Sequence, residues 1–314
     1  MVRFPQISQN QHAVVLGAGL DGLLTARALT EYFQRVIVVV SGVLPTEAAL
    51  PQNLAEALPM HLLSVQGFRN LERLFPGLSA ELMTAGAPTV EWTADAAMLL
   101  PGGWAPRFHS DLISRPVTLN LLQQVLRQRL LDYSGGRVTF LEGREVVGIE
   151  RGTARSGLRL GLRGASTGEI IPADLVVYAA GAPVPVNHPL QQAGWPLPTR
   201  TITGSPIGLA ARLYRRPLAY QAGWQALLIL PQAGQPGGVL MPVEHGHWLV
   251  MLMTEGDVPR DETAFMALAR RLPAPVLADA LQQALPLTPV LAQHDAQAAR
   301  CSMAIWRMIR TESC

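Results

Sequence analysis

Six residues near the start of the chain have the types and the spacing of a phosphate-binding loop. Residues 17–22 read Gly-Ala-Gly-Leu-Asp-Gly, which is a G-x-G-x-x-G pattern. In such a loop the first glycine makes a tight turn, the second lets the backbone approach a pyrophosphate, and the third lets the following helix lie close on the preceding strand. N–H groups at the start of that helix would face the phosphates. The candidate contacts are Gly17, Ala18, Gly19, Leu20 and Gly22.

The elements around this loop decide how much the pattern means, because the pattern alone is common by chance. A short β-branched run at residues 13–16 comes directly before it, helical apolar spacing covers residues 20–33, and a valine-rich run follows at residues 35–40. This order predicts a β-α-β unit, and the unbroken apolar strands favour a parallel sheet that is covered on both faces. A helix start that merely tolerates glycines is the alternative.

The end of the second predicted strand lacks a residue that dinucleotide sites normally use. An Asp or Glu at this position accepts the hydrogen bonds of the adenosine ribose. The sequence has Val40 and Ser41 there, so this contact is absent or is replaced by the Ser41 hydroxyl. A lost charge-assisted hydrogen bond costs roughly 1.5 to 3 kcal/mol, which predicts weakened binding and makes occupancy of the site doubtful.

Composition is typical of a globular protein with two domains or one large α/β unit. The chain has 314 residues, of which 49% are hydrophobic and 15% charged, with a formal net charge of +2. This balance offers no basic surface for nucleic acid, and no apolar run reaches the roughly 18 residues of a membrane span. Cys301 and Cys314 have no partners at metal or disulfide spacing, and the N-terminus has no signal-peptide pattern. A reducing cytoplasm is therefore the expected location.

The remaining elements follow from periodicity and from the positions of proline and glycine. Helical apolar spacing predicts helices at residues 60–75, 116–133, 262–272 and 275–285. Apolar runs predict strands at residues 88–92, 96–100, 137–141, 145–151, 158–163, 170–171 and 174–179. After residue 183 the alternating strands at residues 207–214, 224–230, 237–243 and 247–253 predict an antiparallel sheet.

Other motifs in the sequence give weaker evidence of a functional site. His245 and His247 could share one face of a strand, but no third ligand is near in sequence, so a tight turn is favoured over a metal site. The chain has no lysine, which excludes the G-x-x-x-x-G-K-[ST] phosphate loop. No Ser-His-Asp set occupies a nucleophile elbow. We therefore assign no metal ligand and no catalytic acid, base or nucleophile.

Beyond the glycine loop, the sequence resembles bacterial FAD-dependent monooxygenases and hydroxylases related to para-hydroxybenzoate hydroxylase. The segments that carry the resemblance are Leu-Leu-Thr-Ala-Arg-Ala-Leu at residues 23–29 and Arg-Val-Ile-Val-Val-Val-Ser-Gly-Val-Leu-Pro at residues 35–45. The likeness continues through residues 60–63, 74–78, 114–116, 211–217 and 242–250. It covers almost the whole chain, from near residue 13 to near residue 289.

The resemblance implies further contacts to FAD. In the family a Ser-Arg pair opens a long helix, and its arginine contacts the ribityl-pyrophosphate region of the flavin, a role that would fall to Arg115. A helix-capping serine beside an exposed arginine is the alternative. Val146 and Val147 match a strand whose main chain binds adenine, and Ala180 and Gly181 match a second nucleotide signature after a buried strand.

The sequence also departs from the family pattern. Family members continue well beyond this length, starting with a Gly-Asp motif that holds the ribityl chain, and nothing in this sequence supplies it. A basic element before the helix at residues 60–75 is replaced by Glu-Ala-Leu-Pro at residues 56–59. From residue 301 the sequence has neither a helical nor a strand pattern, as in a frameshifted or prematurely ended reading frame.

Together these features predict an α/β fold made of a two-dinucleotide-binding, Rossmann-like FAD domain and a mixed or antiparallel-sheet substrate domain, with the C-terminal part of the family fold missing. The FAD domain would be discontinuous, with residues 1–85 and 110–185. The substrate domain would comprise residues 86–109 and 186–290, and residues 291–314 would form an irregular tail.

The function implied by the resemblance is that of an FAD-dependent monooxygenase. NAD(P)H would reduce FAD, and one oxygen atom would be inserted into an apolar or aromatic small molecule. A non-catalytic remnant or interaction protein without tight flavin binding is the alternative. A plain NAD(P)-binding reductase is a weaker one, because no arginine follows Ser41 to take a 2′-phosphate. Apolar surface left by the missing last helix would favour an oligomer.

Overall fold

The computed structural model describes residues 11–46, 65–151, 158–163, 169–179, 191, 200–232 and 234–301. The chain divides into two units, each of which is discontinuous in sequence. Unit 1 consists of Met1–Thr46, Leu126–Thr201 and Arg300–Cys314, and unit 2 consists of Glu47–Val125 and Ile202–Ala299. The finer domain boundaries expected from the sequence stay a prediction. Within the described ranges, no helix has the length and apolar content needed to cross a bilayer.

Unit 1 is built on a parallel sheet with the strand order β11-β1-β2-β7. The four strands are β1 (His12–Leu16), β2 (Arg35–Val39), β7 (Val138–Leu141) and β11 (Leu175–Tyr178). The two middle strands are almost fully buried, which explains why their sequences are unbroken apolar runs. Leu16 lies opposite both Val39 and Tyr178, so the strands end together at one edge of the sheet.

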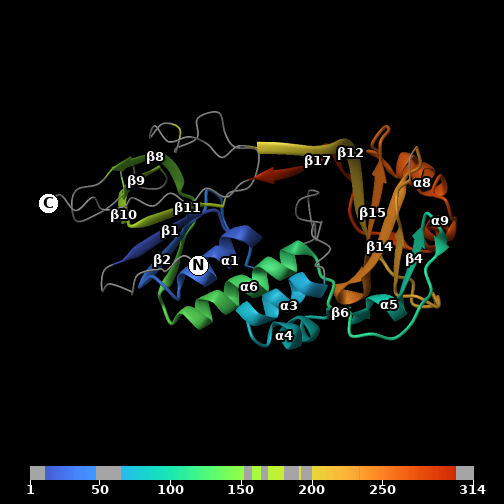
Figure 1. Cartoon of the computed structure of the whole chain (residues 1–314), viewed down its shortest axis with the longest axis horizontal. Helices are drawn as coiled ribbons and strands as arrows, with labels where there is room; N and C mark the ends of the chain where they lie inside the picture. Colours follow the sequence, from blue (N-terminus) through green and yellow to red (C-terminus); the bar gives the residue numbers. More distant parts are fainter. Residues whose placement is uncertain are drawn as a thin grey trace. The chain divides into compact units, whose positions relative to one another are not determined.

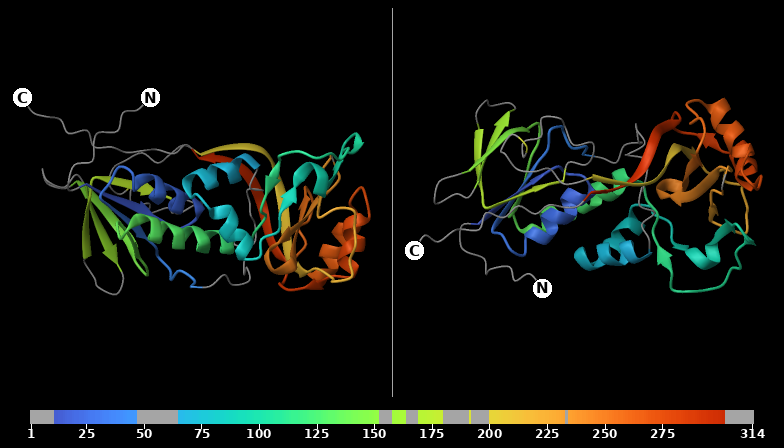
Figure 2. Two further views of the ribbon diagram at one scale, coloured as in Figure 1. Left: turned by 90° about the horizontal axis from the view of Figure 1, so that it is seen from below. Right: turned by 45° about the horizontal axis from the view of Figure 1, so that its top comes forward.

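Two further layers accompany this sheet. An antiparallel sheet of β8 (Glu145–Arg151), β9 (Leu158–Arg163) and β10 (Glu169–Ala173) appears as a separate layer in Figure 2. Its residues Ile149 and Leu160 share a core with Val14 and Ile37 of the parallel sheet. Helices α1 (Leu20–Leu29) and α6 (Leu119–Ser134) run alongside the parallel sheet (Figure 1). The guanidinium of Arg27 in α1 stacks on the ring of Tyr133 in α6, 3.8 Å from its centroid. The predicted β-α-β unit is confirmed.

Unit 2 is built on a mixed sheet whose path runs β16-β12-β15-β14-β13-β4-β5, with β17 paired to β12. The strands are β4 (Ala96–Leu100), β5 (Gly103–Trp104), β12 (Arg200–Arg215), β13 (Ala226–Ile229), β14 (Gly237–Val243), β15 (His247–Thr254), β16 (Leu285–Pro286) and β17 (Leu291–Cys301). Strands β12 to β15 pair antiparallel, whereas β4 and β13 are parallel. The sequence predicts a mixed or antiparallel sheet, and the parallel pair of β4 and β13 makes it mixed.

Side chains alternate along each strand, so each face of this sheet contributes to its own apolar cluster. Helices α8 (Glu262–Arg270) and α9 (Val276–Gln282) lie together beside β14 and β15 in Figure 1. They share a core with Leu240, Val250 and Leu252, to which α8 contributes Phe265 and α9 contributes Leu277. The opposite face carries a second apolar cluster, formed by Ala211, Leu213, Val243, Leu249 and Leu291.

Strand β17 corrects the expectation of an irregular tail from residue 291. The sequence here is rich in Ala and Gln and lacks the alternating apolar pattern by which strands are recognised. Among the three residues of β17 whose side chains are described, Leu291 enters the apolar cluster. The strand forms because β12 offers a free backbone edge, and backbone hydrogen bonds do not depend on side-chain type.

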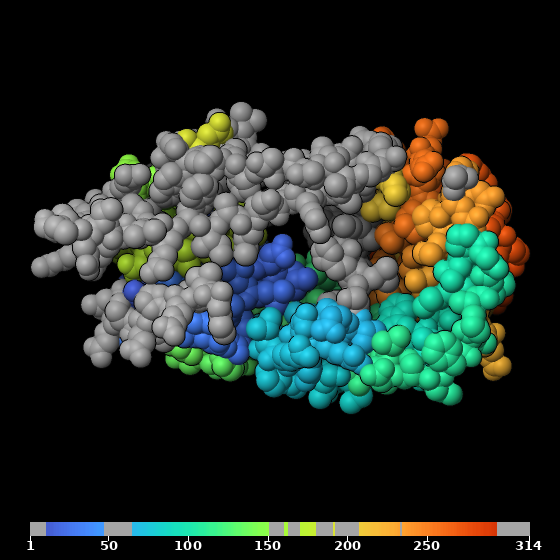
Figure 3. Space-filling view, in the orientation of Figure 1, coloured from blue at the N-terminus to red at the C-terminus, as the bar shows by residue number. Residues whose placement is uncertain are grey.

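The rest of unit 2 is a group of short elements. They are α3 (Val65–Leu74), α4 (Leu78–Thr84), β3 (Val90–Glu91), α5 (Trp92–Asp95) and β6 (Ile113–Ser114). Their cyan and teal segments form a continuous part of the surface in Figure 3. Helix α4 was not predicted, since it begins directly after the Pro-Gly pair expected to end the previous helix. Helix α6 begins at Leu119, three residues later than predicted from Pro116.

We expect Phe265→Ala to lower the free energy of unfolding by about 3–5 kcal/mol, because the ring is fully buried between α8 and the sheet. Urea denaturation followed by circular dichroism would measure this change. The matched control is Phe108→Ala, whose ring is 59% exposed and whose loss should change stability by less than about 0.5 kcal/mol. Equal effects of the two substitutions would contradict this assignment of the core.

Candidate functional site

The glycine loop leaves β1 and enters α1 within three residues. Gly17 has φ 108, in the left-handed region that favours glycine, and its N–H donates to the Val39 carbonyl at 2.9 Å. Gly19 is the N-cap residue of α1, and its carbonyl accepts from the Leu23 N–H at 2.9 Å. The first N–H groups of the helix therefore point out of the turn, where they can bind an anion.

Gly19 and Gly22 are required for different physical reasons. A Cβ built on Gly22 would lie 2.0 Å from the Gly17 carbonyl oxygen, so no side chain fits between α1 and the turn. A Cβ on Gly19 would meet nothing within 4 Å, and its backbone (φ −64, ψ −179) is open to any residue. The fold thus explains Gly22 but not Gly19. A backbone kept bare toward solvent suits a group that approaches closely, as a pyrophosphate does.

Neighbouring strand ends frame this loop. The Ala179 N–H donates to the Leu16 carbonyl at 2.8 Å, so the chain leaves β11 at the same edge as the glycine loop. The predicted contacts Ala180 and Gly181 follow directly, but they lie outside the described residues. Val40 follows β2 at this edge, and Ser41 is exposed. The carboxylate expected at the end of β2 is thus absent from this position, as the sequence indicates.

The loop after β2 is fastened to the turn between β7 and β8, which sequence reasoning did not foresee. Backbone hydrogen bonds join Val40 to Leu141 and to Arg144 at 2.9 Å each, and Gly143 to Gly42 at 3.0 Å. The Glu142 carboxylate accepts the Leu44 N–H at 2.8 Å, and Arg127 donates to the Pro45 carbonyl. The Glu142 carboxylate therefore lies at this edge, directly after the neighbouring strand β7.

Val147 lies at a β-bulge. The register of β8 against β9 shifts between Val146 and Gly148, which leaves Val147 as the extra residue. Strand β8 ends the described order β10-β9-β8, so one of its backbone edges is unpaired within that sheet. Val147 is 42% exposed. Its main chain can therefore bind a ligand, which is the kind of contact expected for this residue.

Arg115 belongs to unit 2 and is held by hydroxyl groups. Its Nε donates to Ser79 at 2.7 Å, and its Nη1 donates to Thr89 at 2.5 Å. Both acceptors are neutral, and among the described residues no carboxylate forms an ion pair with this guanidinium. The side chain is oriented while its charge stays uncompensated, which suits an anionic ligand.

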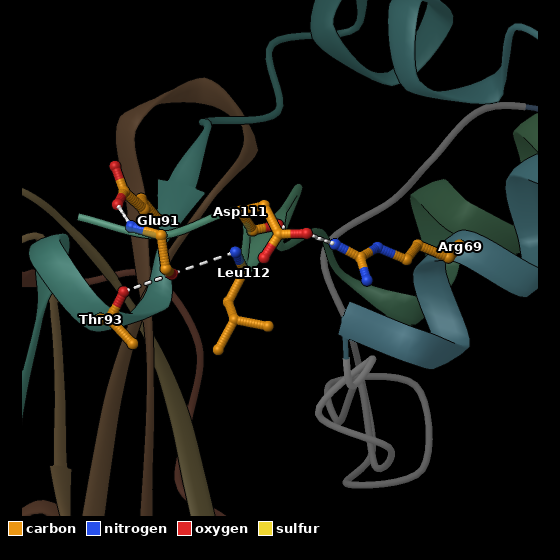
Figure 4. Close-up of polar contacts among 6 residues, drawn as sticks. Arg69, Glu91, Thr93, Asp111 and Leu112 are labelled. Carbon is orange, nitrogen blue, oxygen red and sulfur yellow. Dashed lines mark hydrogen bonds and ion pairs between the residues drawn. The ribbon is translucent and has the colours of Figure 1, made fainter.

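Several polar contacts fix the segment that leads to Arg115 (Figure 4). Asp111 forms an ion pair with Arg69 at 2.7 Å. Glu91 accepts the Ser110 N–H and contacts His109 at 3.2 Å, and the hydrogen bond from Ser110 is the main reason why the pKa of Glu91 is lowered. Nearby, the Trp92 indole donates to the Ser114 hydroxyl at 2.7 Å. The segment is thus positioned from both α3 and the residues around α5.

A buried carboxylate at the start of α6 was also missed from the sequence. Glu244 is 6% exposed and accepts the Thr118 N–H at 2.9 Å, while its second oxygen accepts the Thr118 hydroxyl. The same hydroxyl accepts the Leu121 N–H at 3.4 Å. A negative charge at a helix N-terminus is stabilising. Residue spacing could not reveal this pair, because 126 residues separate the partners.

The His-Gly-His segment forms the tight turn expected between β14 and β15. His245 has φ 60, and the rings of His245 and His247 lie 6.0 Å apart. Burial lowers the pKa of His247, and the charge of His245 adds to this. The described residues hold no group of three His, Cys, Asp or Glu side chains arranged for a metal ion.

Comparison with known sequences gives a distant relative. No protein-family model matches the chain. The chain is 28% identical to Protein Rv3254 of Mycobacterium tuberculosis over 295 residues, which are 88% of this chain and 60% of that protein. The chain thus spans about three fifths of the length of this relative. The name of that protein states no activity.

Comparison with solved structures identifies the fold. The myxobacterial chondrochloren halogenase CndH matches 93% of this chain and 64% of its own, with a TM-score of 0.65 and 16% identity. p-Nitrophenol 4-monooxygenase PnpA of Pseudomonas putida matches 92% and 70%, with a TM-score of 0.62 and 18% identity. A flavin-dependent brominase matches 92% and 68%, with a TM-score of 0.64 and 13% identity. The chain has the fold of FAD-dependent monooxygenases and halogenases, which confirms the monooxygenase fold expected from the sequence resemblance.

We expect the two loop glycines to respond differently to alanine. Gly22→Ala should lower the free energy of unfolding by about 1–3 kcal/mol, because its Cβ would force α1 away from the turn. Gly19→Ala should leave stability unchanged or raise it by up to about 1 kcal/mol, since its backbone suits alanine. Thermal or urea unfolding of both variants would measure the contrast. Similar destabilisation by both would mean that Gly19 also serves the fold.

Glu244→Ala should lower the free energy of unfolding by about 1–3 kcal/mol, because it leaves the buried Thr118 N–H and hydroxyl without their acceptor. Glu255→Ala, at an exposed position of the same unit, is the matched control and should have little effect. Urea denaturation would compare the two. A neutral Glu244→Ala variant would show that the carboxylate does not stabilise the helix start.

Proposed function

We propose that the protein is an FAD-dependent oxidoreductase of the monooxygenase type, acting on an apolar or aromatic small molecule. The observation that carries the proposal is Gly19, which the fold leaves bare at the start of α1 although any residue could adopt its backbone conformation. A fold common to FAD-dependent monooxygenases and halogenases supports the same cofactor.

The residues of unit 1 fit a dinucleotide at most of its expected contacts. Backbone N–H groups of residues 18–22 would hold the pyrophosphate, since the Gly17 N–H already donates to the Val39 carbonyl. The free edge of β8 at Val147 would take the adenine, and Ser41 would meet the ribose. Ala180 and Gly181 would complete this edge. The uncompensated guanidinium of Arg115 in unit 2 would interact with the ribityl-pyrophosphate region.

When bound, FAD would supply the redox chemistry, with NAD(P)H as the proposed reductant and molecular oxygen as the oxidant. The chain's own residues would bind and orient the ring and keep water from the reacting atoms. The described residues that we assign to the site act by charge and by backbone contact. No side chain among them is needed as an acid or a base.

An apolar wall in unit 2 supports the proposed substrate class. On the sheet face opposite α8 and α9, register places Met98 beside Leu228, Leu228 beside Val239, and Val239 beside Met251. None of these side chains can ionise or form strong hydrogen bonds. Methionine adapts its shape to irregular apolar ligands, so this wall favours a neutral apolar or aromatic substrate over one carrying a charge.

Two alternatives make different predictions about ligands. A non-catalytic remnant or interaction protein is favoured by Val40, which removes the usual ribose contact, and it would bind FAD weakly. An NAD(P)-binding reductase would bind NAD(P)H in the absence of flavin. The two cysteines without partners in sequence favour the reducing cytoplasm as the location in each case.

A spectrum of the purified chain with added FAD tests the proposal. We expect a perturbed visible flavin band and a dissociation constant of about 1 μM or tighter, which corresponds to about −8 kcal/mol. Reduction of the bound flavin by NADH or NADPH would be followed by bleaching of the same band. Binding weaker than this, without a perturbed band, would favour the non-catalytic alternative.

Gly19→Ala should weaken FAD binding by about tenfold or more, since its methyl group takes up the space in which the backbone approaches the pyrophosphate. Fluorescence titration with FAD would measure the dissociation constants. Gly102→Ala is the matched control, because a Cβ there also meets nothing within 4 Å, but the residue lies in the β4–β5 turn of unit 2. Equal affinity of Gly19→Ala and wild type would remove the main support for the proposal.

A further inference from the structure

We infer that Glu142, at the end of β7, supplies the carboxylate that binds the adenosine ribose in place of the acid missing from β2. The inference rests on the proposed function, because it concerns the adenosine half of FAD. It assigns a binding role to a residue that neither the glycine motif nor the resemblance indicates.

Strand pairing places Glu142 beside the position that lacks the acid. β2 and β7 are parallel, with Val39 opposite Leu141, so Val40 and Glu142 are the next residues to leave the two strands. Neighbouring strands lie about 4.8 Å apart. The two chains stay together past this point, since the Val40 N–H bonds the Leu141 carbonyl and the Arg144 N–H bonds the Val40 carbonyl, at 2.9 Å each.

The Glu142 side chain is directed toward the loop after β2. Its Oε2 accepts the Leu44 N–H at 2.8 Å, so the carboxylate crosses from β7 to the segment of residues 41–45. The Arg127 side chain holds the same segment through the Pro45 carbonyl. The loop and the carboxylate are thereby fixed relative to each other, as a contact to two neighbouring hydroxyl groups requires.

The Glu142 carboxylate has acceptor sites left for a ligand. Two carboxylate oxygens offer about four acceptor sites, and one of them takes the Leu44 N–H. Glu142 is exposed, and within the described ranges no arginine or histidine forms an ion pair with it. Its nearest basic contact, Arg144, donates to its backbone carbonyl at 3.5 Å. Ribose hydroxyls donate well to such an uncompensated anion.

Comparing FAD with FMN isolates the adenosine half, because FMN lacks the adenosine ribose. We expect Glu142→Ala to weaken FAD binding by roughly ten- to a hundredfold and to leave FMN binding unchanged, since it removes a charge-assisted hydrogen bond. Glu142→Gln keeps an acceptor for the Leu44 N–H and should still weaken FAD binding. Glu150→Ala, an exposed acid of β8, is the control and should bind both flavins as wild type does.

A relocated carboxylate provides the sharpest test. In the double variant Val40→Glu/Glu142→Ala, an acid stands at the end of β2, and FAD affinity should return to at least the wild-type level. Unchanged FAD affinity in Glu142→Ala, or equal losses for FAD and FMN, would overturn the inference alone. A Glu142→Gln variant with wild-type FAD affinity would also overturn it, because the only role of Glu142 would then be to hold the loop through the Leu44 N–H. A wild-type chain that binds neither flavin would overturn the proposed function as well.

Discussion

The close approach of α1 to the turn after β1 is the constraint on which the geometry of unit 1 depends. Gly22 has no room for a Cβ against the Gly17 carbonyl, and a Cβ there would lie 3.7 Å from Ala179. Three segments thus meet at one point: the end of β1, the start of α1 and the end of β11. This contact aims the free N–H groups of the helix at the edge where the parallel strands end, which is the arrangement by which helix N-termini bind anions.

Around this edge, the chain positions its polar groups mainly through backbone hydrogen bonds. The loop after β2 is joined to the β7–β8 turn, which contains Arg144, and the bulge at Val147 follows in β8. In unit 2 the corresponding hydrogen bonds are made by side chains. Hydroxyls orient Arg115, and Glu244 fixes the start of α6. Unit 1 thus relies on backbone contacts at the edge of its parallel sheet, and unit 2 on side-chain contacts that orient Arg115.

These properties agree with a fold in which the cofactor supplies the chemistry and the protein supplies binding and orientation. The apolar wall of the unit 2 sheet and the glycine-loop edge of unit 1 are each formed by contacts within their own unit. Their combination in one reaction is what the proposed function adds.

The sequence by itself determined the β-α-β unit, the glycine loop and the absence of an acid at Val40, because each depends on short-range pattern and on residue type. It also predicted a mixed or antiparallel sheet in unit 2, since short apolar runs between glycines and prolines, such as those of β14 and β15, are a local property. It did not predict α4, whose seven residues give too short a period to recognise, or β17, which forms through backbone pairing with β12.

Only the tertiary structure decided which residues support the site. The partners of Thr118 and of Leu44 lie 126 and 98 positions away in the chain, and no spacing rule connects them. The different reasons for Gly19 and Gly22 were equally invisible, because the motif contains both glycines and only the packing of α1 shows which one the fold requires. Local pattern fixes which elements form, whereas the contacts between them depend on where the folded chain brings distant residues together.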